Sequence, residues 1–173
     1  MTRTGHHLVG IAAGICTAAW VRALLPGSAW FLAIPAGWFG GVAPDRLEYA
    51  GRFRWVSHRT LTHWGLLWAA LTGWTIWRFV QAAPPGWVDA GLAGFSAGGF
   101  SHLLMDWPNP MGIPWLLPHK RHSLGWWQSG RHELELVVAA FGVAWVAWHC
   151  HGPCGPQCPN MWQLLDANFW PGL

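Results

Sequence analysis

Apolar residues in this chain gather into five segments separated by polar loops. The segments cover approximately residues 8–25, 29–43, 64–83, 87–105 and 134–150. No stretch alternates apolar and polar residues over a useful length, which argues against β-strands. The pattern therefore predicts an all-α protein of about five helices.

The lengths of these segments decide whether they could cross a membrane. A helix that spans the bilayer needs roughly 17–25 residues, so the second segment is short and the fifth is marginal. The second also contains Pro35 and several glycines, which suits a re-entrant or strongly tilted helix. We predict a multi-pass helical bundle over residues 1–150, followed by a Pro-, Gly- and Cys-containing tail over residues 151–173.

Composition supports the membrane interpretation. Apolar residues make up 53% of the chain and charged residues 10%, against about 25% charged in a typical soluble domain. The 17 tryptophans agree, because indole rings favour the membrane–water interface. A soluble all-α protein with a large core is the alternative. The net charge of +3 is mild and scattered, so we expect no nucleic-acid partner.

The basic residues predict an orientation in the membrane. If all five segments cross, the N-terminus and the loops 44–63 and 106–133 lie on one side. That side carries eight of the ten basic residues: Arg3, Arg46, Arg52, Arg54, Arg59, Lys120, Arg121 and Arg131. Cytoplasmic loops are enriched in Lys and Arg. We therefore predict a bacterial inner-membrane protein with this side in the cytoplasm.

Candidate metal ligands occur on the same side. They are His6, Asp45, His58, His63, His102, Asp106 and Glu133. Ionisable groups near membrane segments are costly and are functional candidates for that reason. A single histidine there could be an ordinary interfacial residue, but the coincidence of the whole set predicts a metal site at the cytoplasmic face.

His102 and Asp106 form the sharpest pair, because their i, i+4 spacing puts both side chains on one helix face. Gly94 and Gly98 extend this stripe backwards, and the first helix carries a similar stripe of His6, Gly10, Gly14 and Ala18. Small residues at every fourth position let membrane helices approach closely. We expect the two stripes to pack together and bring His6 to His102 and Asp106. The alternative is that the glycines serve packing alone.

The remaining candidates are weaker when taken one at a time. The i, i+5 spacing of His58 and His63 separates them by about 140° on a helix, so we do not expect them to bind one ion as neighbours, and we favour His63 as a ligand. Asp45 could ligate a metal, act as a base toward water, or be a solvated loop acid. Glu133 opens the last helix, where the helix dipole favours a carboxylate in any case.

The order of these residues resembles a known family. The matching blocks are Gly5-His6, Pro44-Asp45, His58-Arg59-Thr60-Leu61-Thr62-His63 and Gly98-Gly99-Phe100-Ser101-His102-Leu103-Leu104-Met105-Asp106, followed by Gly112 and Pro118. They resemble the LexA-binding, inner-membrane-associated metal-dependent hydrolase family from residue 5 to about residue 135. The resemblance implies a multi-pass membrane protein and a hydrolase. More distantly, the pattern is similar to the zinc-dependent phospholipase C and P1-type nuclease enzymes, which cut phosphate esters.

The chain departs from the family pattern in places. Where the family has a further acid and a histidine after Pro-Asp, this chain has Arg46-Leu47-Glu48. Leu47 removes a candidate ligand that Glu48 replaces only in part, so an inactive member is conceivable. The choice between Glu133 and Glu135 stays open. Cys150, Cys154 and Cys158 lie outside the resemblance, and we assign them no function.

We predict a hydrolase that uses metal-activated water on a phosphate ester or an amphiphilic, lipid-like ester. Two or three divalent ions, zinc by preference, would be held by the candidate ligands, with Asp45 and Arg59 taking part in catalysis. One alternative is a non-catalytic membrane module that binds a protein partner and carries a structural metal. A metal or proton transporter is disfavoured, because transport needs ionisable groups near the bilayer midplane. The oligomeric state stays open.

Overall fold

The computed structural model describes residues 1–25, 27–81, 85–128 and 130–150. These residues are mostly helical. The helices are α1 (Arg3–Val21), η1 (Ala29–Leu32), α2 (Ala33–Gly40), α3 (Ala43–Arg46), η2 (Leu61–His63), α4 (Gly65–Gln81), α5 (Trp87–Asp106) and α6 (Glu133–Cys150). The prediction of a mostly helical chain is confirmed. The cysteines expected in the tail, Cys154 and Cys158, lie outside the described residues.

The five apolar segments correspond to α1, η1 with α2, α4, α5 and α6. The second segment gives the shortest helical region, as expected from the sequence. It ends at Ala43, where the separate helix α3 begins. The expectation of no strands was wrong in one place. Strands β1 (Tyr49–Ala50) and β2 (Phe53–Arg54) form a small antiparallel hairpin. Its turn needs the positive φ of 64° that Gly51 adopts, a conformation that glycine reaches without steric cost.

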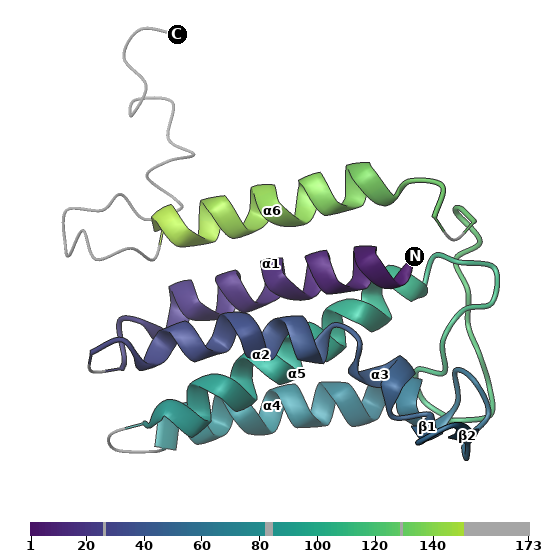
Figure 1. Ribbon diagram of the computed structural model, residues 1–173, viewed down its shortest axis with the longest axis horizontal. Coiled ribbons are helices and arrows are strands. Elements are labelled where there is room, and N and C mark those ends of the chain that lie inside the picture. Colours follow the sequence, from purple (N-terminus) through teal and green to yellow (C-terminus); the bar gives the residue numbers. More distant parts are fainter. Residues whose placement is uncertain (26, 82–84, 129, 151–173) are drawn as a thin grey trace, which may run out of the picture.

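The long helices lie side by side and alternate in direction (Figure 1). The N-terminus, α3, the hairpin and the connection between α5 and α6 therefore gather at one end of the bundle, which we call the loop end. This is the grouping of loops that the alternation of apolar segments predicted. An apolar cluster of Ala43, Trp68, Leu103 and Ile113 packs beneath the loop end.

The close approach of the helices follows a seam of small residues on three helices rather than two. A Cβ atom at Gly10 would lie 2.5 Å from the carbonyl oxygen of Gly37. A Cβ atom at Gly98 would lie 2.9 Å from the backbone nitrogen of Gly41. Both stripes therefore pack against α2 and its C-terminal Gly41. A third stripe of Ala33, Gly37 and Gly41, which the sequence analysis did not predict, lies between the stripes of α1 and α5. The expectation that their packing brings His6 to His102 and Asp106 is confirmed.

Apolar side chains also cover the outside of the bundle. On α6, Leu134 is 73% exposed and Trp145 is 64% exposed. Among the described residues, α6 is the one helix that is long and apolar enough to cross a membrane, judged by length and composition, while Ala29–Gly40 is apolar but shorter. The five crossings expected from the sequence stay a prediction.

Candidate metal centre

Six of the seven candidate ligands come together at the loop end, from five separate parts of the chain. His6 lies in the first turns of α1, and His102 and Asp106 lie in the last turns of α5. Asp45 belongs to α3, His63 to η2, and His58 to the loop before it. His6, His63, His102 and Asp106 are buried, with at most 3% of each residue exposed.

Four of these side chains lie close together, and we call them the central cluster: Asp45, His63, His102 and Asp106. The Nε2 atoms of His63 and His102 are 3.2 Å apart. Asp45 Oδ1 lies 3.3 Å from the first and 3.8 Å from the second. Asp106 Oδ2 lies 3.9 Å and 3.6 Å from the same two nitrogens.

These separations match the needs of a divalent ion. Zinc binds nitrogen and oxygen at about 2.0–2.2 Å in tetrahedral sites, which puts neighbouring donor atoms roughly 3.3–3.5 Å apart. The five distances in the central cluster, 3.2 to 3.9 Å, lie close to that range. The donor set of two imidazoles and two carboxylates is also one that zinc accepts. The residues present therefore fit a metal ion.

His6 extends the central cluster on the α1 side. Its Nε2 atom lies 3.3 Å from Asp106 Oδ1, and its ring stacks on that of His102 with centroids 3.8 Å apart. The residue is 3% exposed, and its Nδ1 atom has no hydrogen-bond partner. His6, His102 and Asp106 form one group able to hold a metal, and Asp45, His63 and His102 form another. Because both groups include His102, they adjoin and form one centre.

Hydrogen bonds set the orientation of the two central imidazoles. His102 Nδ1 donates to the carbonyl oxygen of Gly41 over 2.8 Å, so the lone pair of the neutral ring lies on Nε2 and faces the cluster. His63 Nδ1 is 3.1 Å from Thr62 Oγ1 and 3.3 Å from Glu48 Oε1. Metal-binding histidines commonly use their second nitrogen in this way.

Glu48 lies beside the central cluster, although the sequence indicated only a partial role for it. It is 1% exposed. Its Oε2 atom lies 2.8 Å from His58 Nδ1, and its Oε1 atom accepts a hydrogen bond from the Arg59 backbone over 2.9 Å. Leu47, by contrast, is 51% exposed. The buried acid beside the cluster is therefore Glu48. It also joins Asp45 and His58 in a further group able to hold a metal.

Arg59 holds Asp106 in place. Its Nη2 atom lies 2.6 Å from Asp106 Oδ2, and its Nη1 donates to the carbonyl oxygen of Gly112 over 3.3 Å. Asn109 donates to the other carboxylate oxygen over 3.0 Å. Arg59 adopts a positive φ of 57°, which is uncommon for a residue other than glycine and is often found at functional sites. Its guanidinium is buried against Asp106 rather than free in solvent.

Glu133 lies apart from these groups. Its carboxylate accepts hydrogen bonds from the backbone nitrogen and the hydroxyl of Thr2. It thereby ties the start of α6 to the residue that caps α1. Among the described residues, the groups able to hold a metal do not include Glu133 or Glu135.

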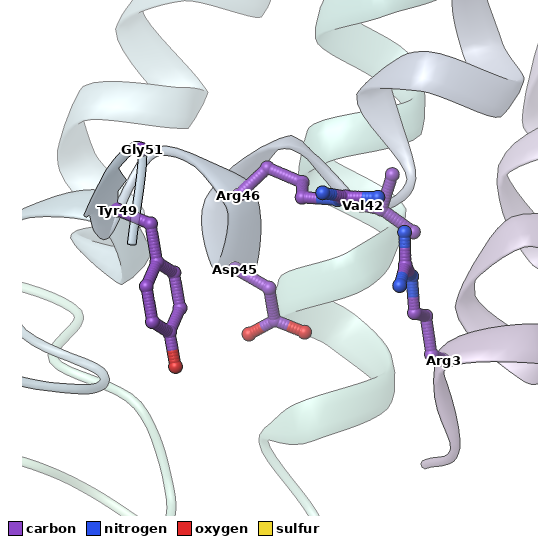
Figure 2. Close-up of a pocket in the computed structure, with 6 residues that line it drawn as sticks. All are labelled: Arg3, Val42, Asp45, Arg46, Tyr49 and Gly51. Atoms are coloured by element: carbon purple, nitrogen blue, oxygen red, sulfur yellow. The ribbon is translucent and has the colours of Figure 1, made fainter. Parts of the chain in front are cut away.

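Asp45 is the cluster member most open to solvent, with 37% of its side chain exposed. Burial raises the pKa of its carboxyl, but the hydrogen bond with His63 and the attraction of His102, His63 and His6 lower the pKa further, to about 2. Asp45 is therefore ionised at neutral pH. It lines a cavity of about 760 Å³ together with His6, His58, Arg59 and Asp106. It also lines a neighbouring cavity of about 600 Å³ with Arg3, Arg46 and Tyr49 (Figure 2).

Comparison with known proteins adds the family context. A family profile described as YdjM inner membrane protein matches residues 1–160. Inner membrane protein YdjM of Escherichia coli (strain K12) is 29% identical over 170 residues, an alignment covering 87% of this chain and 84% of that protein. The protein of the same name from Shigella flexneri gives the same values. No solved structure gives a significant match.

Proposed function

The chain belongs to the YdjM inner membrane protein family, and from this premise we propose that it is a metal-dependent hydrolase of the bacterial inner membrane. Its association with the lipid bilayer follows from the family. The hydrolytic activity is our proposal and depends on the central cluster. The best substrate class is a phosphate ester carried by an amphiphilic molecule, because the cluster lies at one end of a bundle with an apolar surface.

The observation that carries the proposal is the convergence of the donor atoms. The Nε2 atoms of His63 and His102 are 3.2 Å apart, and the Asp45 and Asp106 carboxylates complete the set. Buried polar groups are ordinarily paired in hydrogen bonds, because leaving them unpaired costs stability. Here two imidazoles are held within 4 Å of each other and of two carboxylates, and the buried Nδ1 atom of the neighbouring His6 has no hydrogen-bond partner, which supports a site for a cation.

The residues would hold two or three divalent ions, zinc by preference. The central cluster would hold the first, and Asp45, Glu48 and His58 would hold a second, so Asp45 belongs to both sets of ligands. When bound, zinc lowers the pKa of water to about 7 and polarises an ester oxygen. The cluster fits this role because its donors are oriented before any ion arrives.

The protein side chains divide the remaining work. Ionised Asp45 faces the 760 Å³ cavity, where it can orient a water molecule and accept its proton as the water oxygen bonds to phosphorus. The ester P–O bond then breaks, and the departing oxygen takes up a proton from solvent. Arg59 acts as a positioning residue, since its guanidinium fixes Asp106 rather than facing the cavity freely.

Placement in the membrane completes the proposal. The eight basic residues that predict a cytoplasmic face belong to the segments of the loop end. We assign the loop end, and therefore the cluster, to the cytoplasmic side of a multi-pass bundle. A position at the bundle end favours hydrolysis over transport, which needs its ionisable groups near the bilayer midplane.

The test combines metal content with activity. Full-length protein purified in detergent is expected to retain zinc, measured by inductively coupled plasma mass spectrometry, and to hydrolyse a generic phosphodiester. Asp45→Asn is expected to lower the turnover rate by about 10²–10⁴-fold, the range for loss of a general base. Asp89→Asn, at the opposite end of the bundle, is the matched control and should keep full activity.

Two results would overturn the proposal. Wild-type protein that holds zinc but hydrolyses neither phosphodiesters nor phospholipids would make the metal structural, as in a membrane module that binds a partner. Equal turnover in the wild type and Asp45→Asn would remove Asp45 from the reaction.

A further inference from the structure

A second surface of the loop end joins the candidate metal centre to the apolar outside of the bundle. Beside the 600 Å³ cavity lies another of about 480 Å³, and the two share Arg3, Val42 and Arg46 in their walls. The smaller cavity is otherwise lined mainly by apolar side chains, among them Trp38, Phe39, Leu47 and Phe95. We call it the apolar groove.

The apolar groove opens on the outside of the bundle. Phe39 is 58% exposed and Trp38 is 39% exposed. Both come from α2, and the groove also reaches Phe95 on α5. In a protein of an inner-membrane family, apolar side chains exposed in this way face lipid tails rather than water. A hydrocarbon chain could therefore enter from the bilayer.

Two arginines stand where the apolar groove meets the 600 Å³ cavity. The side chains of Arg3 and Arg46 both extend toward Val42 (Figure 2), and both line the two cavities. Within the part of the chain that the structure describes, neither side chain makes a hydrogen bond or an ion pair with the protein. Two unpaired guanidinium groups on one wall attract an anion, and planar guanidinium matches phosphate oxygens in particular.

The far wall of the 600 Å³ cavity leads to the central cluster. Asp45 lines this cavity and also the 760 Å³ cavity that contains His6, His58 and Asp106. The order from lipid to metal centre is therefore the apolar groove, the arginine pair, Asp45 and the cluster. An arginine that only anchors a helix at the membrane surface needs no such cavity on each side.

We propose that the apolar groove and the Arg3–Arg46 pair bind an anionic phospholipid, with an acyl chain in the groove and its phosphate between the two guanidinium groups. The phosphate then lies beside the 600 Å³ cavity that Asp45 also lines. This inference rests on the proposed function only in naming the substrate of the same centre. The binding itself needs no metal, since none of the groove residues or the two arginines belongs to the central cluster.

The test measures binding apart from hydrolysis. Full-length protein in detergent micelles is stripped of metal with a chelator, and fluorescent phosphatidic acid is added at increasing concentrations while its anisotropy is recorded. The double variant Arg3→Gln/Arg46→Gln is expected to bind at least tenfold more weakly. Arg52→Gln/Arg121→Gln is the matched control, because it removes two exposed charges of the same loop end that line neither cavity.

Further arms identify the ligand. Leu47→Glu places a negative charge in the apolar groove and should weaken phosphatidic acid binding while leaving the two arginines intact. Inorganic phosphate should compete poorly, because it lacks the acyl chain. Equal loss of binding in the two double variants would mean that only general charge attraction operates, and full competition by inorganic phosphate would replace the lipid by a free anion. Either result overturns this inference.

The two proposals fail in different ways. Lipid binding that depends on Arg3 and Arg46, with no hydrolysis after zinc is restored, contradicts the hydrolase and leaves the lipid site standing. Hydrolysis of a soluble phosphodiester with no dependence of lipid binding on the two arginines contradicts the lipid site alone.

Discussion

Charged side chains are arranged differently at the two ends of the helix bundle. At the end opposite the loop end, Arg78 and Asp89 form a close pair. The Nη2 and Nε atoms of Arg78 lie 2.8 Å and 2.9 Å from the same carboxylate oxygen of Asp89. The other oxygen of Asp89 accepts a hydrogen bond from the Gly86 backbone over 2.8 Å. Both carboxylate oxygens of Asp89 are thus satisfied by protein donors, and that end needs no ligand.

At the loop end, several ionisable groups lie close together in addition to the Arg59–Asp106 pair. The Nε2 atoms of His63 and His102 face each other with Asp45 and Asp106 beside them. A neutral imidazole offers one donor and one acceptor, and the donor of His102 is already used by Gly41. Buried charges that pair one to one stabilise the end of a helix. Several acceptor groups that lie close together can instead form a set of metal ligands.

The largest expected effect on this difference between the two ends comes from removing the imidazole of His102. His102→Ala is expected to abolish zinc retention, because two of the three groups able to hold a metal include His102. Zinc per chain, measured after gel filtration, should fall close to zero. Asp89→Asn should retain the wild-type amount, and a His102→Ala protein that keeps its zinc would rule out the central cluster.

Helix packing gives the next largest effect. Gly37→Ala would place a Cβ 2.5 Å from the Gly10 carbonyl oxygen and 2.7 Å from Gly14 Cα. Overpacking of this kind costs about 1–3 kcal/mol, so thermal unfolding in detergent should begin at a lower temperature. Gly73→Ala is the matched control, since nothing lies within 4 Å of its new Cβ, and it should stabilise α4 by about 0.5–1 kcal/mol. An unchanged melting temperature in Gly37→Ala would argue against the three-helix seam.

Glu48 tests whether the outer carboxylate supports the centre. Glu48→Gln keeps the shape of the side chain but removes the charge that faces His58 and His63. Loss of such a partner typically weakens metal binding 10–100-fold, which competition with a zinc-chelating dye can measure. Glu135→Gln is a control at a carboxylate that is 70% exposed. Equal affinities in the two variants would leave Glu48 without a role at the centre.

The smallest effect belongs to the paired end. Asp89→Asn weakens the contact with Arg78, whose side chain is 42% exposed, so the cost is about 1 kcal/mol. A small fall in melting temperature with unchanged zinc content is the expected result. A fall in zinc content would show that the two ends are not independent.

The sequence predicted much of this arrangement because the signals are local. The apolar segments located the long helices, and alternation of those helices put the loops at one end. The i, i+4 spacing of His102 and Asp106 identified their shared face, and the repeated small residues of α1 and α5 indicated close packing. Each inference needs only the geometry of a single helix or the count of helices.

The remaining features depend on contacts between distant segments. Glu48 follows a short helical turn, and its burial is decided by where His58 and the Arg59 backbone arrive. Spacing in the sequence says little about that. The stripe of Ala33, Gly37 and Gly41 lies in a segment that appeared too short to organise the bundle. Glu133 resembled a late ligand, yet an acid in a first helical turn equally well ties two termini together, as its bonds with Thr2 show.

Gly41 takes part both in helix packing and in the orientation of a candidate metal ligand. Its small size admits α1, since a Cβ there would lie 2.9 Å from Gly10 Cα, and its carbonyl oxygen holds His102 by the ring nitrogen that faces away from the cluster. A shift of α2 along its axis would therefore turn the imidazole as well. If the proposed metal site is correct, assembly of the helices and binding of the ion would be one cooperative event. Chelation should then loosen the bundle, and substitutions among the packed glycines should weaken zinc affinity.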